Sequence, residues 1–85
     1  MNTTATKSIK ASELANNPNP PHILRIADIK AETEKAVFWR QPDFGGWIAK
    51  STIIEIVNVI SDDNTILWTG MVIPNWVYRK SLRTY

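Results

Sequence analysis

Residues 34–51 read EKAVFWRQPDFGGWIAKS, and this stretch decides the fold. Its first part, residues 36–40, crowds valine, phenylalanine and tryptophan into five positions, which is the composition of a strand. Successive side chains of a strand point to opposite faces, so Val37 and Trp39 lie together on one face. Pro42 ends this strand because proline has no N–H to give to a sheet.

A turn and a second strand follow. Residues 41–46 contain one proline and two glycines, and a positive φ at Gly45 or Gly46 would fold the chain back on itself. Trp47 then opens the returning strand, residues 47–50. The stretch therefore predicts a β-hairpin to which the rest of the chain adds strands and helices.

Two more strands are expected downstream of the hairpin. Residues 53–60 are mostly isoleucine and valine, and residues 65–73 follow after a polar turn at 61–64. Gly70 within the last strand indicates a bulge or a close approach of the backbone. Both strands carry the β-branched side chains that favour a pleated sheet.

A short helix is expected after the last strand. Pro74 stops the strand, and Asn75 is placed to cap a helix over residues 76–82. The lysine and arginine of this segment make the helix basic and amphipathic.

The part of the chain before the hairpin is polar at first. We expect residues 1–21 to form a flexible arm and a proline-rich spacer, with Ser12 capping a single helical turn before the prolines. Residues 23–32 mix isoleucines with charges, and strand and helix both fit their spacing. The β-branched content and the preceding Pro21 favour a strand. Residues 22–85 then form one β-rich domain.

These elements predict a mainly β, α+β fold. Five short antiparallel strands and a short C-terminal helix suit a small, strongly bent sheet or a partly open barrel of the SH3 or OB kind. A chain of 85 residues has room for one compact domain.

The composition narrows the functional classes. Cysteine is absent, so disulfides and thiolate metal sites are excluded, and we expect neither a metal nor a cofactor. No apolar run has the length of a signal peptide core or a membrane helix, so we expect a soluble, cytoplasmic protein. The net charge of +2 is too small to draw a polyanion to the whole molecule, and the basic residues gather toward the two ends.

Three motifs within residues 32–82 resemble a group of small, largely uncharacterised proteins of phages, prophages and other mobile elements. The motifs are ETEKA at 32–36, WIAKS at 47–51 and VIPNW at 72–76, where the group reads ETEKA, WIPKS and VPxW. The chain departs from the group at Ala49, where the group has proline. The resemblance implies a mobile-element origin and a small accessory role, and it assigns no activity to particular residues.

The sequence lacks the residue sets that enzymes use. An enzyme needs a nucleophile with a base, a pair of tuned carboxylates or a metal, and none assembles here. His22 is the only histidine, and we expect it to be exposed on the spacer. The run at residues 62–64 lacks the glycine and the distant glutamate of a calcium loop and is interpreted as a hairpin turn. We therefore expect a non-enzymatic protein.

Aromatic side chains beside basic ones are the unusual feature. Tryptophan occurs four times, and such interleaving with lysine and arginine suits single-stranded nucleic acid, whose bases stack on exposed rings. The plainer interpretation is that the tryptophans fill a small core. We favour core positions or helix docking for Trp47 and Trp76, whereas for Trp39 and Trp68 core and surface stay equally open.

Two binding hypotheses follow. In the first, the protein contacts single-stranded nucleic acid or a nucleoprotein complex. In the second, it modulates or inhibits a host enzyme or defence system, or forms a homodimer through an exposed strand edge. We favour the first, with stacking from Trp39 and Phe44. The cations expected to contact phosphate, or to contribute to a protein interface, are Arg40, Lys50, Arg79, Lys80 and Arg83.

Overall fold

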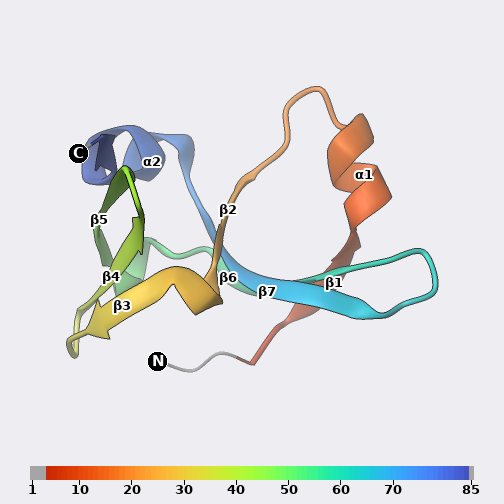
Figure 1. Cartoon of the computed structure of the whole chain (residues 1–85), viewed down its shortest axis with the longest axis horizontal. Coiled ribbons are helices and arrows are strands. Elements are labelled where there is room, and N and C mark those ends of the chain that lie inside the picture. Colours follow the sequence, from red (N-terminus) through yellow and green to blue (C-terminus); the bar gives the residue numbers. More distant parts are fainter. Residues whose placement is uncertain (1–3, 85) are drawn as a thin grey trace.

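The structure, a computed structural model, describes residues 4–84 of the chain. Within them, eight strands form two four-stranded sheets, sheet A in the order β1-β6-β7-β2 and sheet B in the order β3-β4-β5-β8 (Figure 1). The elements run in the order β1 Lys7–Lys10, α1 Ala11–Asn16, β2 His22–Arg25, η1 Ile26–Asp28, β3 Ile29–Glu32, β4 Ala36–Gln41, β5 Phe44–Ala49, η2 Lys50–Thr52, β6 Glu55–Ile60, β7 Ile66–Ile73, α2 Asn75–Ser81 and β8 Arg83–Thr84.

The predicted fold class is confirmed, and the predicted strand count is wrong. The chain is mostly strand with a short helix after the last long strand, as expected. Two sheets replace the single five-stranded sheet, and within residues 4–84 they do not close into a barrel. No helix in this part of the chain is both long and apolar enough to cross a membrane.

The chain passes from one sheet to the other between residues 22 and 32. β2 pairs with β7 in sheet A, and β3 pairs with β4 in sheet B. The 3-10 turn η1 lies between β2 and β3 and changes the direction of the chain. The strand prediction for residues 23–32 is therefore confirmed on both sides of a bend that it did not include.

Part of the predicted flexible arm is a strand. β1 lies parallel to β6, with Ile9 opposite Val59, so this segment is held by the sheet. The helical turn expected next is present as α1, but the hydroxyl of Ser12 donates to Asp62 Oδ1 (3.0 Å) instead of capping the helix. The arm prediction for residues 1–3 lies outside the described residues.

The organising hairpin is confirmed, but its glycines act differently from the prediction. Gln41 and Phe44 are the last paired residues of β4 and β5, so the two residues between them make the whole turn. Neither Gly45 nor Gly46 has a positive φ, and both lie within β5. A Cβ at Gly46 would lie 1.9 Å from the carbonyl oxygen of Ser81. Glycine is needed there because the end of α2 rests directly on the strand.

The core lies between the sheets, and α2 contributes to it. Trp39 is 3% exposed, and its Nε1 donates to the carbonyl oxygen of Arg25 (3.0 Å). This bond ties β4 of sheet B to the end of β2 in sheet A. The buried side chains of the core are Leu24, Val37, Trp39, Ile48, Ile56, Met71, Ile73, Val77 and Leu82.

Replacing Trp39 with phenylalanine is expected to destabilise the fold by about 1–3 kcal/mol. The smaller ring leaves a cavity, and the Arg25 carbonyl loses its donor. Urea unfolding followed by circular dichroism measures the change, and Trp76→Phe, at a residue that is 58% exposed, is the matched control. Equal unfolding midpoints for the two variants would contradict this account of Trp39.

Candidate nucleic-acid interface

The outer face of sheet B carries a pair of aromatic rings. Along β4, Val37 and Trp39 point into the core, and alternation turns Phe38 to the opposite face. Along β5, Ile48 is fully buried and Trp47 is 49% exposed. Phe38 and Trp47 are cross-strand partners with ring centroids 5.2 Å apart and ring planes tilted by 41°. The two rings therefore form one aromatic platform.

Two arginines flank this platform on the same face. Gly45 is the cross-strand partner of Arg40 on one side and of Arg83 on the other. This row lies two residues along the strands from Phe38 and Trp47, a distance of about 7 Å. Both arginines are exposed, and the glycine between them has no side chain to separate them. We call Phe38, Trp47, Arg40 and Arg83 the aromatic–arginine face.

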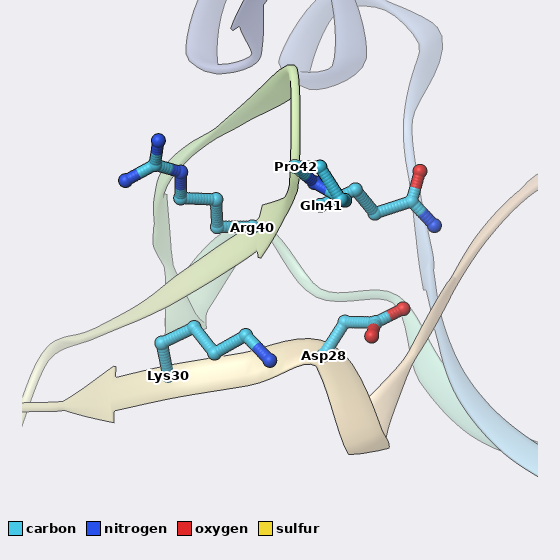
Figure 2. A pocket seen from close by; sticks show the side chains of 5 residues that line it. All are labelled: Asp28, Lys30, Arg40, Gln41 and Pro42. Carbon is cyan, nitrogen blue, oxygen red and sulfur yellow. The ribbon is translucent and has the colours of Figure 1, made fainter.

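Arg40 also lines a hollow at the edge of sheet B. Arg40 lines a shallow hollow of about 260 Å³ together with Asp28, Lys30, Gln41 and Pro42. Figure 2 shows that Arg40 and the neighbouring Gln41 point to opposite sides of β4, and that Arg40 points away from Asp28. The hollow therefore holds two cationic side chains, Lys30 and Arg40, and one carboxylate, Asp28.

An ion pair lies near the other end of sheet B. Lys50 Nζ is 2.5 Å from Glu32 Oε2, which joins the residue after β5 to the end of β3. The hydrogen bond and charge of Lys50 hold the pKa of Glu32 below its ordinary value of 4.5. Because its charge is paired, Lys50 is less suited to bind phosphate than the sequence suggested.

Lowering the pH is expected to weaken the fold partly through Glu32. A carboxyl whose pKa is lowered by folding stabilises the protein above its unfolded pKa, and the contribution is lost as the pH falls through the folded pKa. Between about pH 7 and about pH 3, we therefore expect the wild type to lose more stability in urea than Glu32→Gln. Asp63, whose pKa is lowered by the hydrogen bond from Ser61, titrates in both proteins. Equal losses in the two proteins would contradict the role of Glu32.

Two of the predicted site residues face the interior. Trp39 is buried, so its ring is closed to an incoming base, and the stacking prediction for it is wrong. Phe44 is half-buried, with its ring centroid 5.8 Å from that of Trp39 and 5.7 Å from that of Tyr78. Its ring packs within the protein, so the stacking prediction for Phe44 is corrected in the same way.

The remaining predicted cations are exposed, but only two share the aromatic face. Arg40 and Arg83 lie together across Gly45, as described above. Arg79 and Lys80 are exposed in the last turn of α2, shortly before Arg83. The predicted cations therefore divide into the row on sheet B, the helix end and the paired Lys50.

Sequence reasoning missed the stacking rings that the structure presents. Trp47 was expected in the core, and Phe38 was not considered as a site residue, yet these two form the platform. The alternation of Phe38 with the buried Trp39 was the available signal, because it places Phe38 on the opposite face. Trp76, expected in the core or docking the helix, is 58% exposed on α2. Trp68 is half-buried under the guanidinium of Arg25, 4.9 Å from its ring centroid.

His22 belongs to the structure of the domain and not to an exposed spacer. It is half-buried in β2, and its ring stacks on Tyr78 with centroids 3.9 Å apart and planes 9° from parallel. Its Nε2 lies 3.0 Å from Asn75 Oδ1. Asn75, expected to cap the helix, is the first residue of α2, and Pro74 occupies the cap position. No group of three or more acidic, histidine or cysteine side chains that could hold a metal occurs among residues 4–84.

Comparisons with protein families, with curated proteins and with solved structures give no match for this chain.

Proposed function

We propose that the protein is a non-enzymatic accessory binding protein of a phage or mobile element that contacts single-stranded nucleic acid, alone or in a nucleoprotein complex. The proposal rests on one observation: the Phe38–Trp47 platform lies beside Arg40 and Arg83 on one face of sheet B. The mobile-element part rests on the motif resemblance alone.

The aromatic–arginine face has the two components that single-strand binding needs. A base that stacks on an aromatic ring contributes about 1–3 kcal/mol, and every base has a ring face to offer. The Cα atoms of Arg40 and Arg83 lie about 7 Å along the strands from those of Phe38 and Trp47, so the arginine side chains can reach the phosphate of a base stacked on Trp47. Arg40 and Arg83 are separated by two strand spacings, about 10 Å between Cα atoms, so they can contact neighbouring phosphates.

The end of α2 adds positive charge where the arginine row ends. Arg79 and Lys80 precede Arg83 by four and three residues and are exposed. On sheet B, Glu32 is already paired with Lys50, so its charge opposes a phosphate less. Four of the basic side chains, Arg40, Arg79, Lys80 and Arg83, therefore lie on sheet B or on the helix that leads into its edge strand β8.

Titration of tryptophan fluorescence with a short oligothymidine at several salt concentrations tests the proposal. Each phosphate contact to a single strand adds about −0.7 to the slope of log K against log salt, so two arginines predict a slope of about −1.4. Arg83→Gln is expected to reduce the slope by about 0.7. Lys7→Gln removes the same charge from sheet A, where Lys7 is paired with Glu55 (2.9 Å), and is the control. An unchanged fluorescence at high oligonucleotide concentration would overturn the proposal.

A second candidate function is binding of a host protein, as a modulator or inhibitor. It is favoured by Ile66 and Leu67, which are 59% and 53% exposed at the start of β7. The hairpin between β6 and β7 lies far from β3, β4 and β5 of sheet B (Figure 1). The register shifts opposite Ile66 and Leu67, between Val59 and Ile60, so both aliphatic side chains protrude from the hairpin tip. This tip becomes the leading candidate if oligothymidine leaves the fluorescence unchanged. Homodimerisation through a strand edge stays a prediction.

A further inference from the structure

We infer that the hollow beside the aromatic–arginine face binds a guanine base of a single strand, and that Asp28 and Lys30 read the edge of this base. The inference rests on the proposed function and names the base that the strand carries next to the one stacked on Trp47. It follows from the position of the hollow and from the chemistry of the side chains that line it.

The hollow adjoins the aromatic platform. Arg40, which lines it, follows Phe38 by two residues and lies on the same face of β4. On β3 the register shifts between residues 29 and 31, where Lys30 lies, and the next residue, Ala31, is the cross-strand partner of Phe38. A strand with one base stacked on the platform can therefore place a neighbouring base in the hollow.

Two charged side chains in the hollow are not used by the fold. Within residues 4–84, neither the carboxylate of Asp28 nor the ammonium of Lys30 makes a hydrogen bond or an ion pair. Asp28 is half-buried at the end of η1, and Figure 2 shows the Lys30 side chain extended along β3 toward it. The hollow therefore offers both an acceptor and a donor of hydrogen bonds to one ligand.

The carboxylate indicates a base and not a phosphate as this ligand. A carboxylate repels a phosphate, so cations alone would make the better site for the backbone. A base is uncharged, and it offers N–H groups to a carboxylate and a carbonyl oxygen or ring nitrogen to an ammonium. The hollow, of about 260 Å³, is smaller than the pockets of about 300–1,000 Å³ that hold drug-sized ligands, which suits a single base.

Guanine matches the two side chains better than the other bases do. On its Watson–Crick edge, N1–H and the N2 amino group lie next to each other and can donate to the two carboxylate oxygens of Asp28. O6 lies on the same edge and can accept from Lys30. Adenine, cytosine and thymine each have a single hydrogen-bearing nitrogen on this edge, so they offer Asp28 one donor group. The edge is open to a protein in an unpaired strand.

Fluorescence anisotropy with labelled nine-nucleotide strands tests this inference on the wild-type protein. Each strand is oligo-dT with one central guanine, adenine or hypoxanthine, and plain oligo-dT is the reference. We expect the guanine strand to bind at least about fivefold more tightly than the adenine strand, because a bidentate contact to a base edge discriminates by about 5-fold to 150-fold. Hypoxanthine lacks the N2 amino group, and we expect it to lose most of the preference.

Asp28→Asn separates base reading from phosphate binding. Without the carboxylate, we expect the preference for guanine over adenine to fall below about twofold, whereas the affinity for oligo-dT stays equal or rises because a negative charge is lost. Asp43→Asn makes the same change of charge in the β4–β5 turn, outside the hollow, and is expected to keep the preference. Circular dichroism verifies that both variants keep the fold.

Unlabelled guanosine monophosphate distinguishes a guanine within a strand from a free nucleotide. The free nucleotide cannot occupy the hollow and the platform together, so we expect it to displace the labelled guanine strand only at about tenfold or more the concentration of unlabelled strand. Displacement at the same concentration would overturn the strand as the source of the guanine.

The outcomes separate this inference from the proposed function. A guanine preference of at least fivefold that is lost in Asp28→Asn and kept in Asp43→Asn supports both. A smaller preference, or one that the two variants change equally, overturns the reading of guanine by the hollow and leaves single-strand binding standing. Stronger binding of every strand by Asp28→Asn with an unchanged base preference means that the hollow contacts phosphate alone, and it overturns the inference in the same way. Absence of binding to every strand overturns the proposed function and the inference together.

Discussion

The Gly46→Ala protein is expected to be about 3 kcal/mol less stable than the wild type, a large part of the total stability of a domain of this size. The added Cβ would lie 1.9 Å from Ser81 O and 3.0 Å from Ser81 C. Both are backbone atoms, so no side chain can rotate away. The end of α2 must move off β5 and take the buried Val77 and Leu82 with it. Urea or thermal unfolding measures the loss.

Ala49→Ser is the control for this change. It adds one heavy atom to the same strand at an exposed position, and we expect a stability within about 0.5 kcal/mol of the wild type. If Gly46→Ala were as stable as Ala49→Ser, α2 would not rest on β5 as described.

Trp47→Ala is expected to weaken oligothymidine binding by about 5-fold to 150-fold, which corresponds to the 1–3 kcal/mol of one stacked base. Without the Trp47 ring, the platform consists of Phe38 alone. Because Trp47 is 49% exposed and lies outside the core, the variant is expected to fold. Anisotropy of a labelled strand gives the affinity, and circular dichroism verifies that the sheet content is unchanged.

Trp76→Ala separates stacking at the platform from a general effect of losing an exposed indole. Trp76 is 58% exposed but lies on α2, outside the aromatic–arginine face. We expect its replacement to change the affinity by less than about threefold. Equal losses in the two variants would contradict the assignment of stacking to sheet B.

The strands that could be predicted are those with a local signal. Residues 36–40 and 53–60 carry β-branched and aromatic side chains at high density, and both are strands within one or two residues of the expected bounds. β1 could not be predicted because Lys-Ser-Ile-Lys has no such density, and its hydrogen bonds come from a partner strand far away in the sequence. The same holds for the two residues of β8, which are held by β5.

The candidate site was predicted in type more than in position. Aromatic side chains beside arginine predicted a stacking surface, which stays a prediction, and Arg40 and Arg83 lie on the same face as the half-buried Phe38 and the exposed Trp47. The rings were misassigned because the size of a tryptophan does not by itself show that it is buried. Whether it reaches the core depends on which face of its strand it lies on. Alternation fixes the faces of Phe38 and Trp39 relative to each other, but which of the two faces the core depends on the second sheet.

The parallel pairing of β1 with β6 sets the order in which the fold can be completed. Thr6 and Ile56, which are joined by a backbone hydrogen bond, are 50 residues apart, whereas the β4–β5 and β6–β7 hairpins connect near neighbours. During synthesis β1 leaves the ribosome first and must wait, with its backbone groups bound to water, until β6 has emerged. Each hairpin can form within microseconds, but sheet A is complete only after β1 and β2 have joined partners about 50 residues away, so the slow step of folding is expected to be the docking of these two strands onto the β6–β7 hairpin.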